Sequence, residues 1–179
     1  MLQRVSALLL VAGLAVGVKE MVLHFNQVEY FHRWSKAGQH EFTPKGQEDL
    51  DHWQDMVTVN VHDDVKDEKG LADLANQVTS RYQATGKVVR VDMSPRTKDH
   101  PGEPFVAAVL AGPTVREAAF ARFLLQENHG IVVVYSRRIY GTKAEAEMIA
   151  WINANGQKTE QVLRSWAEIP TVAQLKDLH

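Results

Sequence analysis

The sequence contains no cysteine. Without thiols the chain can form no disulfide, no thiolate nucleophile, no iron–sulfur cluster and no cysteine-based zinc site. It also lacks the cysteine to which lipid is attached in exported lipoproteins. A chain of 179 residues is long enough to build a core without disulfides, so the absence of cysteine is compatible with an exported domain.

An excess of charge of one sign is also lacking. The chain has 20 Lys and Arg residues against 22 Asp and Glu residues, a formal net charge of −2. This balance argues against a nucleic-acid-binding protein, which neutralises phosphates with clustered basic residues. No run of Lys and Arg would attract anionic lipid either. Protein partners and small or neutral ligands remain.

The usual catalytic and cofactor motifs are absent. The sequence has no glycine-rich phosphate loop of the GxGxxG or GxxxxGK type and no HExxH zinc motif. The serines lack the GxSxG nucleophile elbow; they include Ser35, Ser80, Ser94, Ser136 and Ser165. We therefore expect no cofactor and no enzymatic activity.

The N-terminus is typical of a secretory signal. Arg4 gives it a positive charge, and an apolar run that is too short to cross a bilayer continues to Val16. Ala15 and Gly17 are small residues at the spacing that signal peptidase recognises. We predict a signal peptide over residues 1–17, a periplasmic or secreted location, and no membrane span after cleavage. An uncleaved signal anchor and a buried N-terminal helix are the alternatives.

Apolar periodicity predicts the elements of the first half of the chain. They are a β-hairpin over 27–43 with its turn at Ala37-Gly38, a short helical turn over 47–51, a strand over 53–62 and a helix over 69–85. In the strand, Val57, Val59 and Val61 alternate with polar residues and should cover a core. In the helix, one apolar stripe is formed by Leu71, Leu74, Ala75, Val78 and Tyr82.

The second half begins with β patterns. Strands are expected over 87–93, 105–111, 114–126 and 130–140, with a proline-rich loop over 94–104. The strand over 105–111 is apolar throughout and should be buried on both faces. The segment 114–126 is compatible with helix or strand. We interpret it as a strand because the β sequence over 130–140 needs a neighbour.

Helices are expected at the C-terminal end. Thr142 and Glu145 form a capping box that should start the first of them. Its buried stripe should contain Met148, Ile149 and Ile152. A second helical stretch after Gly156 should bury Val162, Leu163 and Trp166, and Thr171 with Gln174 should cap a last short helix.

Strand follows strand more often than helix follows strand, which predicts an α+β fold. We expect a mainly antiparallel β-sheet packed between α-helices, in a single domain over residues 18–179. The order resembles the PsbP-like fold family, which includes photosystem accessory subunits and bacterial envelope proteins of the DcrB type. The resemblance covers most of 27–166: the hairpin, the strand feeding the first helix, and the strand series closed by a helix. It implies an accessory or binding role more often than catalysis.

Four residues are candidates for binding. Arg137 and Arg138 are adjacent in an expected strand, so their side chains point to opposite faces and at least one enters an apolar layer. A salt bridge to Glu117, Glu145 or Glu147 is one interpretation, and a site for an anion or a partner's carboxylate is the other. The hairpin aromatics Tyr30, Phe31 and Trp34 belong to the core or to a recognition surface. The candidate binding residues are therefore Tyr30, Trp34, Arg137 and Arg138.

Histidines and carboxylates suggest a metal site that their spacing does not support. His62-Asp63-Asp64 follows His52 and Asp55, but His52 and His62 stand at opposite ends of an expected strand, roughly 30 Å apart. The pair Asp99-His100 in the proline-rich loop is a candidate general base, with solvated loop polarity as the simpler interpretation. We expect no bound metal.

Three functions follow in order of preference. The first is a non-enzymatic envelope protein that binds another protein, as an accessory subunit or as an inhibitor such as a toxin-neutralising immunity protein. The second is a carrier of a small apolar ligand. The third is a hydrolase or metalloenzyme that uses His62, Asp63 and His100. An apolar patch near the early hairpin would favour the first, an enclosed apolar cavity the second, and converging histidines and carboxylates the third.

Overall fold

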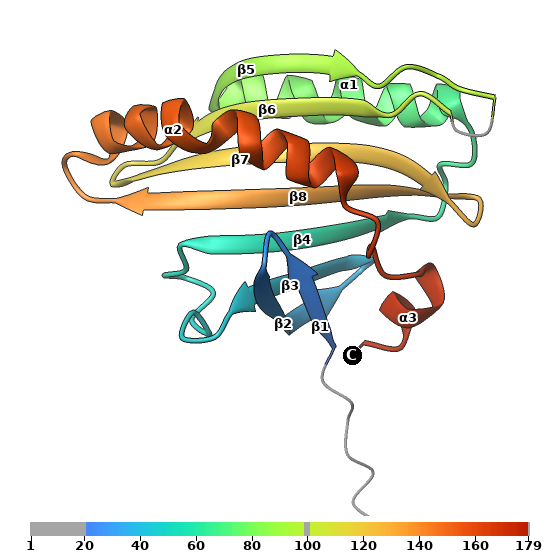
Figure 1. The fold of residues 1–179 in the computed structure, drawn as a ribbon, viewed down its shortest axis with the longest axis horizontal. Helices are drawn as coiled ribbons and strands as arrows, with labels where there is room; N and C mark the ends of the chain where they lie inside the picture. The colour runs from blue at the N-terminus through green and yellow to red at the C-terminus, as the bar shows by residue number, and fades with distance from the viewer. Residues whose placement is uncertain (1–20, 99–100, 179) are drawn as a thin grey trace, which may run out of the picture.

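The computed structural model describes residues 21–98 and 101–178. Eight strands form one sheet in the order β1-β2-β3-β4-β8-β7-β6-β5, and every neighbouring pair is antiparallel. One long helix packs on each face of the sheet, with α2 in front and α1 behind in Figure 1. The predicted α+β fold with a mainly antiparallel sheet between helices is confirmed. The predicted signal peptide lies outside the described residues.

Along the chain the strands come in two runs of four, each followed by one long helix. The strands are β1 Val22–Phe25, β2 Val28–Lys36, β3 Gln39–Pro44, β4 Asp55–His62, β5 Gly86–Met93, β6 Pro104–Ala111, β7 Val115–Gln126 and β8 His129–Tyr140. The helices are α1 Glu68–Thr85, α2 Ala144–Ser165 and the short α3 Val172–Lys176. Within the described parts of the chain, no helix is long and apolar enough to cross a membrane.

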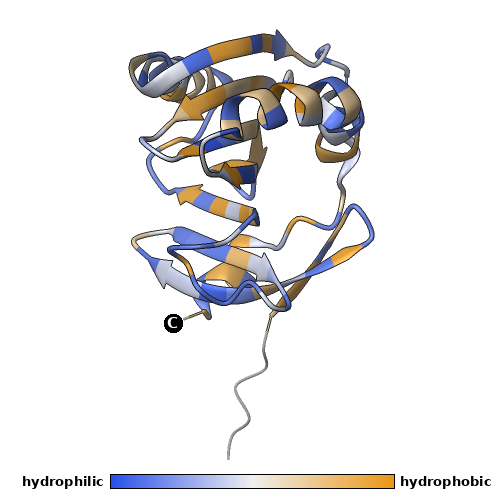
Figure 2. Ribbon diagram, turned by 90° about the vertical axis from the view of Figure 1, so that its left-hand side faces the viewer, coloured by the Kyte–Doolittle hydropathy of each residue, from blue (hydrophilic) through white to orange (hydrophobic). Residues whose placement is uncertain are grey.

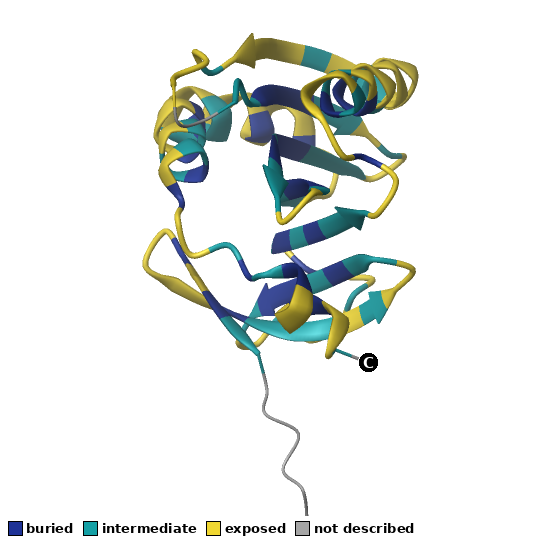
Figure 3. Ribbon diagram, turned by 90° about the vertical axis from the view of Figure 1, so that its right-hand side faces the viewer, coloured by how far each residue is buried: buried dark blue, intermediate teal, exposed yellow. Residues whose placement is uncertain are grey.

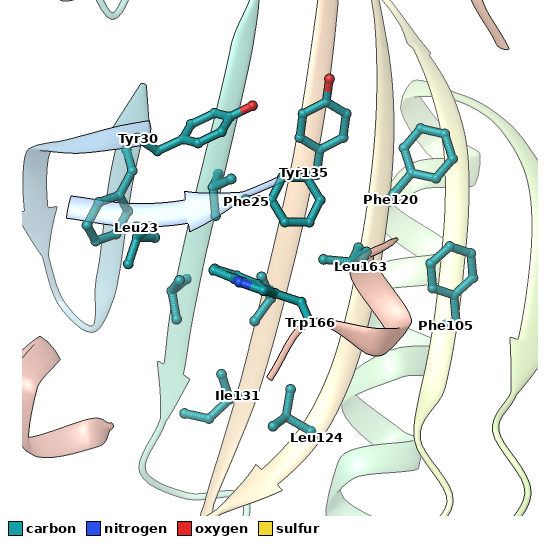
Figure 4. Packing of buried hydrophobic residues seen from close by; sticks show 14 of the residues in the cluster. Leu23, Phe25, Tyr30, Phe105, Phe120, Leu124, Ile131, Tyr135, Leu163 and Trp166 are labelled. Atoms are coloured by element: carbon teal, nitrogen blue, oxygen red, sulfur yellow. The ribbon is translucent and has the colours of Figure 1, made fainter. Parts of the chain in front are cut away.

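Each face of the sheet has its own core. The core on the α2 face contains Phe25, Phe42, Tyr135 and Leu163, together with Trp166 at the end of α2, as Figure 4 shows in part. The smaller core on the α1 face contains Leu71 of the helix. Strand β6 supplies both cores because its side chains alternate between the two faces. This confirms that the apolar run over 105–111 is buried on both sides over its first half.

The central strands agree with the sequence patterns. Val57 and Val59 are fully buried, and Val59 lies directly opposite the equally buried Val133 in β8. The ambiguous segment 114–126 is strand β7, which pairs with β8 along its whole length. The hairpin turn uses Glu127 and Asn128, both with positive φ. Pairing with β8 therefore outweighs the helical propensity of the alanines in β7.

Helix α1 matches its prediction closely. Its N-cap is Asp67, whose side chain accepts a hydrogen bond from the backbone N–H of Gly70 at 2.7 Å. The predicted apolar stripe faces the sheet, with Leu71 fully buried. The short helix α3 also begins as predicted, with a capping box between Thr171 and Gln174.

The start and the middle of α2 differ from the prediction. The N-cap is Lys143, which makes no side-chain cap, so the predicted capping box of Thr142 and Glu145 is not formed. Glu145 instead pairs with Arg116 of β7 at 3.3 Å. It also runs without interruption through Gly156. A helical glycine costs about 1 kcal/mol relative to alanine. Packing of both halves of α2 on one core offsets that cost, since Met148 and Leu163 are both fully buried.

Two smaller predictions were wrong, and one strand was missed. Ile149, expected in the buried stripe, is 57% exposed because it lies beside the sheet edge rather than over it. Residues 47–51 form turns and no helix. There the Gln47 side-chain oxygen accepts the backbone N–H groups of Gln54 and Asp55, which anchors the loop to the start of β4. Strand β1 was not expected at all.

Candidate binding surfaces

Arg137 lies in a polar cluster at one end of the α2 face. Its Nη1 donates to Asp55 Oδ2 at 2.6 Å, and the Tyr135 hydroxyl donates to Asp55 Oδ1 at 2.8 Å. Asp55 opens β4 and lies directly opposite Arg137 in β8, so strand register creates the pair. Arg137 Nε is buried without a hydrogen-bond partner in the described part of the chain. Asp55 was not among the three carboxylates expected to pair with this arginine.

Two tyrosines complete this cluster. Figure 4 shows the Tyr30 and Tyr135 hydroxyls pointing toward the same end of the sheet. Burial, followed by the negative charge of Asp55, raises the pKa of both phenols far above the usual value. Both rings therefore stay neutral and serve as hydrogen-bonding groups on an apolar wall. Neither phenol is therefore a nucleophile or a general base near neutral pH.

Arg138 lies on the other face, as adjacent strand positions require. Its Nε donates to Glu117 Oε2 at 2.7 Å, one of the three partners expected from the sequence. Its guanidinium stacks over the Trp53 ring at 3.9 Å from the ring centre. The two arginines thus each hold a carboxylate in their own layer, and they do not form one joint site.

The candidate aromatics of the hairpin are also separated. Tyr30 is buried in the α2-face core, edge-on to Phe25 at 6.2 Å. A β-bulge between His32 and Trp34 shifts the alternation of β2. Trp34 consequently lies on the outer face and is 38% exposed. Of the three predicted hairpin aromatics, Tyr30 is therefore in the core, Phe31 is half-buried and Trp34 is exposed.

A serine between two histidines lies on the inner face of the same hairpin. Ser35 Oγ is 2.7 Å from His32 Nε2 and 2.7 Å from His40 Nδ1. Burial is the main cause that lowers the pKa of both imidazoles, and His32 also lowers that of His40. No carboxylate bonds to either ring among the described residues, so the group lacks the third member of a triad. The sequence analysis did not single out this group.

The hydrolase hypothesis rests on His62, Asp63 and His100, of which the structure describes His62 and Asp63. Asp63 pairs with Lys176 and His129 at the surface, and His52 pairs with Asp49 in an exposed loop. Asp99 and His100 lie outside the described residues. Within 21–98 and 101–178 no group of three or more His, Asp or Glu side chains could hold a metal ion.

Exposed apolar side chains gather at the β5 edge of the sheet, on the opposite side from the β2–β3 hairpin. Val89, Val91 and Met93 of the edge strand β5 are about half exposed or more, at 49%, 63% and 56%. Ile149 of α2 is 57% exposed and lines the same hollow as Val89. Figure 3 shows β5 as a mostly exposed strand, and Figure 2 shows its apolar segments. The apolar patch thus lies at β5 and α2, not near the early hairpin.

A groove runs between α2 and strands β5 and β6, and we name it the α2–β5 groove. It consists of two adjoining hollows of about 480 Å³ each, which share Val89 and Ile152 as lining residues. The other apolar lining residues are Ala107, Ala108, Val109, Ala111, Ala118, Phe120, Met148, Ile149 and Gly156. The groove is open to solvent along β5, so it differs from the enclosed cavity expected of a carrier.

Small residues create this groove. Ala107 and Ala118 form its floor, and Gly156 of α2 stands above them without a side chain. Charged residues close its ends: Arg116 pairs with Glu145 at one end, and Arg90 pairs with Glu160 at the other. The arrangement is an apolar trough with a polar rim, which suits the burial of apolar side chains from a partner.

Comparison with solved structures shows the fold. The chain aligns with a point mutant of protein Mog1 at 10% identity and a TM-score of 0.50, covering 87% of this chain and 98% of that chain. The Ran-binding protein Mog1p of Saccharomyces cerevisiae aligns at 12% identity and a TM-score of 0.48, covering 81% and 90%. A Pseudomonas aeruginosa protein of unknown function aligns at 8% identity and 0.47, covering 85% and 99%. The structure is thus similar to the Mog1/PsbP-like fold.

Comparison of sequences defines the family. A protein-family model matches residues 16–166, so the chain belongs to that family. None of the curated proteins matches the chain in sequence.

Proposed function

We propose that this chain, as a member of the family matched over 16–166, is a non-catalytic protein-binding domain that holds its partner in the α2–β5 groove. The observation that carries the proposal is the groove itself, whose apolar lining includes the half-exposed Val89 and Ile149. Isolated exposed hydrophobic residues are common on soluble proteins, whereas a contiguous rimmed patch marks an interaction site. Val89 and Ile149 stand on opposite walls of one trough, so the patch is contiguous.

The shape of the groove favours a protein over a small ligand. A carrier for a small apolar molecule encloses most of the ligand surface. Here Val89 and Ile149 remain about half exposed, so a small molecule would stay in contact with water. A helix or an extended segment of a protein fills such a trough and covers both walls.

Export is the second part of the proposal. The signal-like sequence over residues 1–17 supports a periplasmic or secreted location, where DcrB-type envelope proteins of the PsbP-like fold family also belong. A reporter fused after Val18 should reach the periplasm, and the mature chain should begin close to Val18. Recovery of an intact soluble cytoplasmic chain that starts at Met1 would refute this part.

Site-specific photocrosslinking in cells tests the binding role. A benzoyl-phenylalanine placed at Ile149 should give one discrete adduct larger than the chain, which mass spectrometry identifies. The matched control is Val28, which is 40% exposed on β2, outside the groove. Adducts from position 28 but none from position 149 would place the partner elsewhere and contradict the proposal.

A further inference from the structure

Strand β5 forms one of the two edges of the sheet. Among the described residues it pairs with β6 on one side and with no strand on the other. A strand with an unpaired row of backbone N–H and C=O groups is a template for another strand, unless charges or irregularities restrict which strands can add. β5 has both charged residues and a β-bulge, and together they indicate which strand can pair with it.

A β-bulge at Val89 changes which face of the sheet the later side chains of β5 point to. Val88 pairs with Ala108 and Arg90 pairs with Ala107, so Val89 is the extra residue. Before the bulge, Lys87 lines the groove beside α2. After it, Asp92 lies on the same α2 face, because it accepts a hydrogen bond from Arg164 at 2.8 Å. In a regular strand, residues five apart point to opposite faces.

On the α1 face of β5, Val88 and Val91 form a second pair of residues. Val88 packs against the α1-side core, and Val91 lies opposite Val106 of that core. The bulge therefore places Lys87 and Asp92 on one face, and Val88 and Val91 on the other. Opposed residues in an antiparallel pair must share a face. β5 meets this condition with a second copy of itself.

We propose that two copies of the chain pair antiparallel through β5, with Lys87 of each copy opposite Asp92 of the other. The same register sets Val88 against Val91 and Gly86 against Met93, so all eight residues of β5 take part. Opposite charges across a strand pair stabilise it, and like charges destabilise it. A shift by two residues would set Lys87 against Arg90, so charge selects the register.

This pairing adds contacts for two sets of side chains. Lys87 has no ion-pair partner within the described ranges, and Asp92, which pairs with Arg90 and Arg164, has a side chain that is 43% exposed and accessible to a further cation. Val91 and Met93, the most exposed apolar residues of β5, become covered by strand β5 of the second copy. The interface is isologous, because each residue pair occurs twice across the two-fold axis.

The axis of such a dimer is perpendicular to the sheet. Both α2 helices then lie on the same side, and the two α2–β5 grooves open beside each other. The dimer is tested separately from the proposed partner, since strand pairing uses the outer backbone edge of β5, although Gly86, Lys87 and Val89 of β5 also line the groove. Val91 belongs to the edge alone, whereas Ile149 belongs to the groove alone.

Sedimentation velocity of the purified protein between roughly 5 and 500 µM tests the dimer, because a single strand pair supports a weak interface. We expect a species of twice the chain mass of 20.1 kDa at the upper end. Lys87→Asp and Val91→Lys should each weaken the dimer by about tenfold or more. Val28→Lys, at a comparably exposed valine of β2, should leave it unchanged.

Cysteine crosslinking tests the register, because the chain has no cysteine of its own. A mixture of Lys87→Cys and Asp92→Cys chains should form disulfide-linked pairs on mild oxidation. A mixture of Lys87→Cys and Val28→Cys chains should not. A monomer at every concentration overturns the proposal, and so does a dimer that Lys87→Asp and Val91→Lys leave intact.

Discussion

Arg137 and Asp55 lie directly opposite each other in the β4–β8 register, with Nη1 and Oδ2 2.6 Å apart. Both side chains are mostly buried, with 25% and 19% of their surface exposed. The Tyr135 hydroxyl donates to the same carboxylate and depends on its position. The pair therefore closes one end of the α2-face core with a polar cluster in which Asp55 accepts hydrogen bonds from both Arg137 and Tyr135.

Removing Arg137 should destabilise the fold. Arg137→Ala leaves Asp55 without its cation, and we expect a loss of about 2 kcal/mol in the free energy of unfolding, measured in urea. The matched control is Arg96→Ala, whose ion pair with Glu68 is far more exposed and should contribute less than about 1 kcal/mol. An Arg137→Ala protein of unchanged stability would mean that the arginine serves a partner instead.

Val133 should be indispensable to the sheet. It is fully buried between paired strands, and Val133→Asp would place an unpaired carboxylate in the core. The cost of several kcal/mol approaches the total stability of about 5–15 kcal/mol for a typical domain. We expect no cooperative thermal transition for this variant, whereas Val28→Asp at the surface should melt like the wild type. A well-folded Val133→Asp protein would contradict the strand pairing.

Stability should fall as the pH falls below the ordinary histidine pKa. The pKa values of His32 and His40 are lowered from 6.5 in the folded state, chiefly by burial. As the pH falls, the unfolded chain therefore takes up protons at these histidines before the folded chain does. The stability that the neutral histidines allow is fully present above pH 6.5 and is lost as the pH falls toward the folded-state pKa values.

The measurement is the urea midpoint at pH 7.5 and 5.5. The decrease in the urea midpoint from pH 7.5 to pH 5.5 should be smaller in His40→Gln than in the wild type. His52→Gln changes an exposed loop histidine and should keep the drop of the wild type. An equal drop in all three proteins would show that other groups cause it. Asp63 and Lys176 line the same hollow as Ser35 and His40, so their charges face the same space as His40. Asp63→Asn therefore serves as a further control, because it tests whether the nearby carboxylate causes part of the drop in midpoint.

Two glycines should respond to alanine with opposite sign. A Cβ at Gly86 would lie 2.1 Å from the Val109 carbonyl oxygen, so Gly86→Ala must displace β5 from β6 and should lower the melting temperature. At Gly156 the nearest atom is Ile152 Cγ2 at 3.3 Å. Gly156→Ala should leave stability equal or raise it by up to about 1 kcal/mol through helix propensity. A loss of stability at Gly156 would mean that the groove above Ala107 cannot accept a methyl group.

Sequence patterns predicted the elements well where periodicity and packing agree. The alternation of Val57 and Val59 and the stripe that begins at Leu71 led to correct elements because the same residues form the cores. The helix break at Gly156 was wrong because tertiary packing outweighs a local preference. The capping box at Thr142 was wrong because the helix starts one residue later, with Lys143 at the N-cap, and Glu145 pairs with Arg116, which is distant in sequence.

The candidate site was harder to predict than the fold. The pairing of Arg137 with Asp55 depends on which strands are neighbours, and the sequence order does not specify that β4 lies beside β8. The alternation in β2 predicted Tyr30 and Trp34 on one face, and the bulge between them separates them. For the groove, a usable signal was present: the valines in β5 are interspersed with charged residues, which is typical of an edge strand.

The dissociation constant of the crosslinked partner, measured by calorimetry, tests the binding role most directly. Ile149→Asp places a carboxylate on the wall of the α2–β5 groove and should raise the dissociation constant by tenfold or more, or roughly 1.4 kcal/mol. Val28→Asp should leave it unchanged, and both variants should melt like the wild type. Equal affinity of the wild type and Ile149→Asp would contradict binding in the groove.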